Sequence, residues 1–133
     1  MNDKNLYRGK RVDNGEWVDG DLIHRQIWGR ALAIIRISDD GFEHYEEYEV
    51  IPESVGQFTG LHDKNEKKIF EGNIVRVTEG MYGYKSTYHS YVEEVKFYSK
   101  GVAVFLPFDN SDIVEVEVIG NIYDNPELLY NGD

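Results

Sequence analysis

The sequence predicts an all-β protein. Short runs rich in β-branched and aromatic residues are separated by clusters of Gly, Asn, Asp and Pro, which is the pattern of strands and turns. In the run Val114–Val118, valines alternate with glutamates, as expected for a strand with one buried face. No window shows a sustained helical period of 3.6 residues. With 133 residues, 41% of them hydrophobic, the chain can bury one core or two small ones.

The first half predicts an N-terminal β-meander lobe that covers residues 1–58. Its first hairpin is expected from Leu6–Val12 and Glu16–Ile23, which flank Asp13-Asn14-Gly15. Asn and Gly tolerate the positive φ that tight hairpin turns need, so this tripeptide is a strong turn signal.

A second hairpin is expected from Ala31–Ile37 and Phe42–Val50, with a turn at the Asp-Gly-containing segment between them. Its expected buried contacts are Tyr45, Tyr48 and Val50. Pro52 cannot donate a ladder hydrogen bond and ends the pairing, and Ile51–Phe58 is expected to connect the two lobes.

The second half, residues 59–133, predicts a small SH3-like β-barrel. It opens with a hairpin whose type I turn is Asp63-Lys64-Asn65, followed by a residue in the left-handed conformation that Gly usually supplies. Here that residue is Glu66, so we expect mild strain or a longer loop. A strand at Ile74–Val77 follows.

The segment Glu79–Ser90 is polar and rich in Tyr, and it is expected to interrupt the strands. The later strands are expected at Val92–Tyr98, Val102–Phe105 and Val114–Val118. Near the C-terminus, Asn125 is expected to cap a short helical turn opened by Pro126. Leu128 and Leu129 would pack that turn against the sheet.

Three segments carry a resemblance to a known family. The runs Leu6–Val18, Thr59–Val75 and Val118–Leu129 resemble the signature of the YopX family of phage and prophage proteins. Members have Gly and Asp where this chain has Glu66 and Asn73. The resemblance implies a phage or prophage setting and a β-rich fold, and it brings no catalytic residue and no cofactor.

Charge and composition narrow the classes of function. The 25 acidic residues outnumber the 14 basic ones, giving a net charge of −11 spread over both halves. Such a chain repels phosphate backbones, so direct nucleic-acid binding is not expected unless folding gathers Arg25, Arg30 and Arg36 into a patch. The absence of Cys excludes disulfides, thiolate metal sites and cysteine nucleophiles. A polar start and the lack of a long apolar run favour the cytoplasm of the bacterial host and no membrane contact.

No motif predicts a metal, a cofactor or catalysis. Asp63-x-Asn65 resembles the start of an EF-hand loop, but Lys67, Lys68 and Ile74 stand where a ligand, a Gly and the bidentate Glu belong. A type I turn explains the Asp and Asn better. The histidines have no metal-ligand spacing; they are His24, His44, His62 and His89. Adjacent acidic pairs point to opposite faces of a strand and would not act on one substrate.

The candidate site is a Tyr-rich segment with interleaved Gly, Ser and Thr, a composition that suits protein contact surfaces. Its expected contact residues are Met81, Tyr82, Tyr84, Tyr88 and Tyr91. The alternative is a twisted hairpin extension whose tyrosines pack on their own sheet or on the other lobe.

These observations predict a phage- or prophage-encoded protein-interaction module that is not an enzyme. It is expected to form a homo-oligomer through the Tyr-rich segment, whose edge a second copy would cover, and a host or phage protein is a further possible partner. One alternative is an acidic decoy that occupies the nucleic-acid site of a host protein. The other is an unrecognised enzyme with a carboxylate site.

Overall fold

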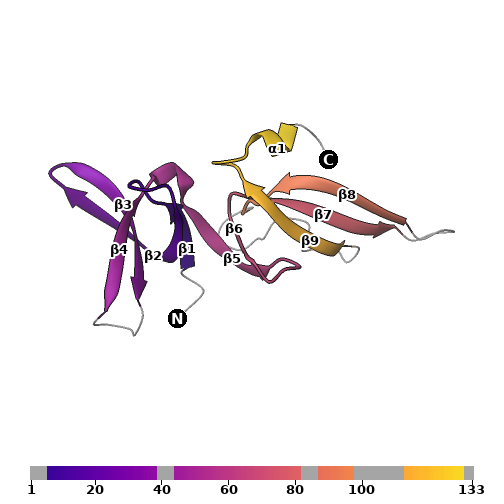
Figure 1. Ribbon diagram of the computed structural model, residues 1–133, viewed down its shortest axis with the longest axis horizontal. Coiled ribbons are helices and arrows are strands. Elements are labelled where there is room, and N and C mark those ends of the chain that lie inside the picture. Colours follow the sequence, from indigo (N-terminus) through magenta and orange to yellow (C-terminus); the bar gives the residue numbers. More distant parts are fainter. Residues whose placement is uncertain (1–5, 39–43, 82–86, 98–112, 131–133) are drawn as a thin grey trace. The chain divides into compact units, whose positions relative to one another are not determined.

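The computed structural model describes residues 6–38, 44–81, 87–97 and 113–130. Its contacts divide the chain into two units, Met1–Gly60 and Leu61–Asp133, and each is described here by itself. Both units consist of β-strands, and the only α-helix in the described residues is four residues long (Figure 1). The predicted all-β class is therefore confirmed.

The first unit is an antiparallel meander followed by a short 3-10 helix. Its elements are β1 (Leu6–Lys10), β2 (Trp17–Ile27), β3 (Arg30–Ser38), β4 (Tyr45–Val50) and η2 (Pro52–Ser54), and β5 (Gly56–His62) begins in this unit. The strands lie in the order β4-β3-β2-β1-β5. The first predicted hairpin is confirmed: Leu6 pairs with Asp21, and Gly15 has the positive φ, 76°, that its turn requires.

The core of the first unit is formed by Ala33, Ile35 and Val50. Val50 lies against Gly9 so closely that a Cβ on Gly9 would stand 2.9 Å from the Val50 Cβ, which explains why β1 has Gly there. Of the three predicted buried contacts of β4, Val50 is buried and Tyr48 half-buried, but Tyr45 is 51% exposed. The prediction for Tyr45 is wrong because it and Val50 are an odd number of residues apart and point to opposite faces.

The predicted connector Ile51–Phe58 is shorter than expected, because β5 already begins at Gly56. Gln57 of β5 pairs with Tyr7 of β1. Ser54 holds the preceding turn in place: its Oγ accepts a hydrogen bond from the Lys10 amide at 2.8 Å and donates one to the Ile51 carbonyl. The predicted lobe boundary at Phe58 thus lies inside a strand.

The second unit contains the last residues of β5 and a three-stranded sheet in the order β8-β7-β9. Its further elements are β6 (Lys68–Phe70), β7 (Asn73–Met81), β8 (Thr87–Glu94), β9 (Ile113–Asn121) and α1 (Glu127–Tyr130). The predicted interruption at Glu79–Ser90 is wrong at both ends, because Glu79 pairs with His89 and Met81 with Thr87 in the β7–β8 hairpin. The predicted strand Val102–Phe105 lies outside the described residues, and the SH3-like barrel stays a prediction.

The inner face of the three-stranded sheet carries the second core, in which Val75, Val77 and Val116 are buried. Val114, predicted to be buried as well, is 51% exposed. The pairing of β7 with β9 steps from Glu115 to Ile113 at this point, so Val114 lies in a β-bulge and Ile113 packs on the core in its place.

The C-terminal turn packs on β9 through Leu128, whose Cδ1 would lie 2.9 Å from a Cβ on Gly120. The predicted capping role of Asn125 differs from the structure. The Asn125 Oδ1 accepts a hydrogen bond from the Asn121 amide at 3.2 Å, so this side chain bonds back to the end of β9 instead of to the helix.

Candidate functional site

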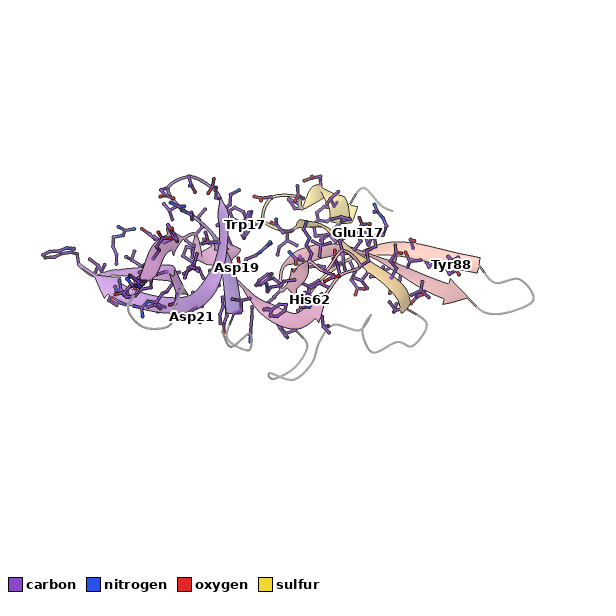
Figure 2. The ribbon with its side chains drawn as sticks, turned by 60° about the horizontal axis from the view of Figure 1, so that its bottom comes forward. Trp17, Asp19, Asp21, His62, Tyr88 and Glu117 are labelled. Carbon is purple, nitrogen blue, oxygen red and sulfur yellow. The ribbon has the colours of Figure 1, made fainter. Side chains whose placement is uncertain are left out.

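The Tyr-rich segment is the β7–β8 hairpin. Tyr82 and Tyr84 lie outside the described residues, and Met81 is the last residue of β7. Tyr88 is 72% exposed on β8, where Figure 2 labels it. Tyr91 lies on the other face, opposite Val77, and packs on the core. The two tyrosines whose side chains are described therefore do not share a surface, because three residues along a strand reverse the side-chain direction.

Two carboxylates, those of Glu79 and Glu93, lie on the inner face of the β7–β8 hairpin. Glu79 lies on β7, while Glu93 and Tyr91 lie on β8. Burial and the charge of Glu79 raise the pKa of Glu93, whose Oε2 has no hydrogen-bond partner within the described part of the chain. The Tyr91 hydroxyl donates to Glu79 at 3.4 Å, and burial followed by the charges of Glu79 and Glu93 raises its pKa to about 12.

This pairing across strands was missed by sequence reasoning, which considered only adjacent acidic residues. Glu93 in its protonated form is chemically able to donate a proton. Within the residues described, however, no group of three His, Asp or Glu side chains is arranged to hold a metal ion.

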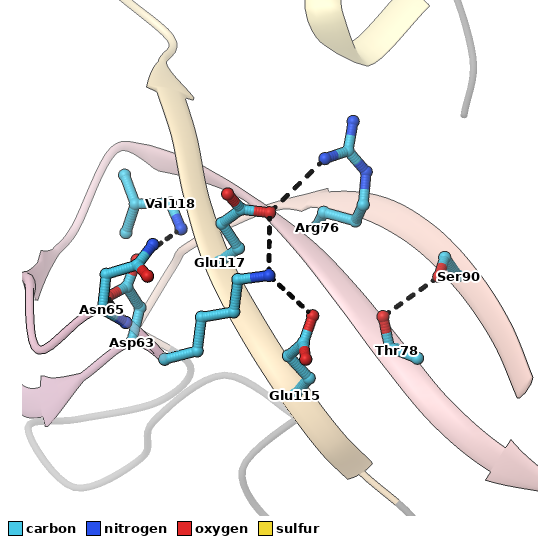
Figure 3. A network of polar contacts seen from close by, with 9 residues as sticks. Asp63, Asn65, Arg76, Thr78, Ser90, Glu115, Glu117 and Val118 are labelled. Atoms are coloured by element: carbon cyan, nitrogen blue, oxygen red, sulfur yellow. Dashed lines mark hydrogen bonds and ion pairs between the residues drawn. The ribbon is translucent and has the colours of Figure 1, made fainter.

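The signature turn of the second unit is organised by the carboxylate of Asp63, as Figure 3 shows in part. Its Oδ1 accepts hydrogen bonds from the Asn65 and Lys67 amides at 2.8 and 2.9 Å, and its Oδ2 accepts one from the Val118 amide at 2.9 Å. Burial opposes ionisation of Asp63, but these three amides outweigh it, and its pKa is lower than usual. Glu66 has φ 64°, which confirms the predicted left-handed residue.

Ion pairs lie on the outer face of the three-stranded sheet β8-β7-β9. Lys64 lies 3.0 Å from Glu115 and 3.7 Å from Glu117, and Arg76 lies 3.6 Å from Glu117 (Figure 3). Such exposed pairs contribute little to stability, because water and salt screen them. The described charges on this face are largely matched by one another.

The β2–β3 hairpin carries the most exposed large hydrophobic side chain of the described residues. Trp28 is 97% exposed at the tip, and its neighbour Ile27 is 40% exposed. Ile27 pairs with Arg30, so Trp28 and Gly29 form a two-residue turn, and their φ values of 52° and 80° are those of type I′. Asn-Gly is the usual sequence of such a turn because Asn accepts the left-handed conformation more readily than a bulky residue does.

Behind this tip, the arginines named in the sequence analysis come together on acidic partners from β4. Arg25 and Arg36 both bind Glu47, at 2.9 and 2.6 Å, and Arg30 lies 3.5 Å from Glu49. Hydrogen bonds from Arg25 and Arg36 lower the pKa of Glu47 to about 2. The patch that nucleic-acid binding would require thus forms, but Glu47 and Glu49 neutralise most of its charge.

Sequence reasoning missed this hairpin tip. It ended one strand at Ile23 and began the next at Ala31, which left Trp28-Gly29 unassigned. Two signals were present: a residue-Gly pair between apolar runs, and the absence of any acidic residue between Asp21 and Asp39 in a chain of net charge −11. Together they mark a projecting, locally basic hairpin.

In the described part of the chain, none of the helices has the length and apolar character to cross a membrane. No curated protein and no solved structure is significantly similar to the chain. The family model described as YopX protein matches residues 6–130, nearly the whole chain. The match covers all three segments that carried the resemblance, and with it the Asp63 turn and the β2–β3 hairpin. The chain therefore belongs to the YopX family.

Proposed function

We propose that this chain is a phage-type interaction module that works by binding other proteins and not by catalysis, and that its contact element is the tip of the β2–β3 hairpin. Membership in the YopX family supports the phage setting. The cytoplasm of the bacterial host is the proposed location. The observation that carries the binding role is the conformation and exposure of Trp28.

Trp28 lowers the stability of the fold through backbone strain, and burial of its side chain does not compensate for this. A bulky residue at φ 52° costs on the order of 1 kcal/mol relative to a residue that accepts the left-handed region. A Trp side chain that is 97% exposed gains almost nothing from burial in return. Trp17 shows the ordinary alternative, because the Arg8 guanidinium covers its ring at 4.2 Å. A strained, uncovered Trp is explained best by a partner that covers it.

A protein surface suits this tip better than a nucleic acid. Trp and Arg are the residues that most often dominate binding energy at protein interfaces, where a large side chain fills a pocket and charged residues surround it. Phosphate binding needs several unneutralised cations, and Arg25 and Arg36 share Glu47. The tip therefore offers a partner one apolar anchor, Trp28, surrounded by a small positive charge.

Site-specific photocrosslinking tests the proposal. The full chain carries p-benzoylphenylalanine in place of Ile27, beside an intact Trp28, and is expressed and irradiated in bacterial cells. Protein adducts are expected, and they should be lost when Trp28→Asn is added. Val12, which is 53% exposed in the same unit, provides the control position. Equal adducts from positions 12 and 27, or adducts that survive Trp28→Asn, would contradict the assignment.

A further inference from the structure

The chain has a second exposed surface whose charge and chemistry are opposite to those of the hairpin tip. In the segment 121–130, Ile122, Tyr123 and Tyr130 are 39%, 41% and 82% exposed. The same segment contains the exposed acidic residues Asp124 and Glu127 and no Lys or Arg. We call it the C-terminal segment.

The C-terminal segment is a defined surface because its backbone is held in place. The Ile122 amide donates to the Gly72 carbonyl at 2.9 Å, and the Asn125 amide donates to the Asn121 carbonyl at 2.8 Å. Leu128 packs on Gly120, so α1 is fixed on β9. A partner would therefore meet a preformed surface and would not have to order it, which lowers the entropic cost of binding.

The hairpin tip and the C-terminal segment lie in parts of the sequence whose charged residues have opposite signs. Residues 22–37 contain Arg25, Arg30 and Arg36 and no acidic residue, whereas residues 113–130 contain only acidic charges. Arg30 is the most exposed of the three arginines, with 72% of its side chain accessible, and its pair with Glu49 is long at 3.5 Å. An exposed indole flanked by an arginine is matched by exposed tyrosines flanked by carboxylates, through stacking, cation–π contact and ion pairing.

We infer that the hairpin tip of one copy, with Trp28 and Arg30, docks on the C-terminal segment of a second copy, with Tyr130 and Glu127. This inference rests on the proposed binding role of the tip and names its partner. The contact joins two different surfaces, so a pair of copies keeps one tip and one C-terminal segment free, and the assembly grows head to tail into a ring or a filament.

Light scattering on purified full-length protein tests this arrangement. The wild type should show a mass that rises with concentration beyond that of a dimer. Trp28→Asn, which removes the anchor and keeps the charge, should weaken association about 30-fold, as expected for a central aromatic anchor. Tyr130→Ser should weaken it through the opposite surface. Val12→Ser is the matched control and should associate like the wild type.

Mixing the two deficient variants gives the sharpest readout. Trp28→Asn retains an intact C-terminal segment and Tyr130→Ser retains an intact tip, so the mixture should form a one-to-one dimer and stop there. A contact between identical surfaces would leave the mixture as weak as its components, which would overturn the inference. A wild type that stays monomeric at high micromolar concentration would overturn it as well.

A charge exchange covers the case in which Tyr130→Ser disturbs the fold. Arg30→Glu and Glu127→Arg should each weaken association, and the double variant should restore it. Association of each single variant should also depend less on salt than association of the wild type. Single variants that are as sensitive to salt as the wild type would contradict the inference. If the wild type is monomeric while the crosslinks at position 27 to other proteins depend on Trp28, the binding role stands and the second-copy partner is wrong. If both experiments fail, both proposals fall.

Discussion

Two turns of this molecule place a non-glycine residue in the left-handed conformation, and they differ in what supports it. Trp28 has φ 52° and Glu66 has φ 64°, and no other described residue except Gly has a positive φ. Glu66 belongs to a turn that the carboxylate of Asp63 holds with three backbone hydrogen bonds. Trp28 projects into solvent. The same local strain is therefore offset by the fold at one turn and left without compensation at the other, and this difference supports the binding role proposed for Trp28.

The largest expected effect comes from removing the support of the Glu66 turn. Asp63→Ala removes the acceptor of three backbone amides, and the Val118 amide is then left without a partner in a partly buried place. Losing three hydrogen bonds to a charged group should lower the free energy of unfolding by about 3 kcal/mol. Trp28→Ala should stay within about 0.5 kcal/mol of the wild type, because an exposed side chain contributes little. Urea unfolding of both variants measures the difference. Similar losses in the two would remove the distinction between the turns.

The support of the Glu66 turn should also depend on pH. The pKa of Asp63 is lower in the folded protein than in the unfolded chain, so its ionised form stabilises the fold above the ordinary carboxyl range. That contribution is lost as the pH falls through the lowered pKa. Asp63→Asn should therefore be less stable than the wild type at pH 7, by about 1 to 2 kcal/mol in the free energy of unfolding. This difference should narrow as the pH falls below the ordinary carboxyl range.

Thermal melts of the wild type, Asp63→Asn and Trp28→Asn across this pH range check the point. Trp28→Asn changes no titratable group and should follow the pH dependence of the wild type. A constant gap between wild type and Asp63→Asn at every pH would show that the charge of Asp63 does not matter to the turn.

The smallest expected effect isolates the backbone strain itself. Glu66→Gly and Trp28→Gly should each raise the free energy of unfolding by about 0.5 to 1 kcal/mol, because Gly occupies the left-handed region without a clash. Similar gains at the two turns would show that the strain is the same and only its compensation differs. Thermal midpoints that fall in both variants would show instead that neither residue is strained.

Local rules predicted the parts of the fold that depend on neighbouring residues. The Asn14-Gly15 hairpin and the left-handed Glu66 both follow from turn preferences within a few residues. The bulge at Val114 did not, because it arises where β9 meets β7 and depends on residues far apart in the sequence. The bond from Asp63 to Val118 also escaped prediction, since the turn alone explains the presence of an Asp.

The Tyr-rich contact site stays a prediction, because the structure describes only part of it. Composition directed attention to the Tyr-rich hairpin, but Tyr88 and Tyr91 face opposite sides of β8. Trp28 was overlooked because its turn uses a rare residue pair, and turn preferences identify the common ones. An unfavourable residue in a tight turn carries little weight in structure prediction, yet it is informative about function.

The hydrogen bond between Asp63 and Val118 has a consequence for the order in which the second unit folds. It joins residues 55 positions apart, so the turn around Glu66 gains its full support only when β9 has arrived. Contacts this distant in sequence form late and slow the search for the native state. A chain still growing from the ribosome would lack the bond to Val118 until β9 is made. We therefore expect the amides of Asn65 and Val118 to become protected from hydrogen exchange together, in the final step of folding.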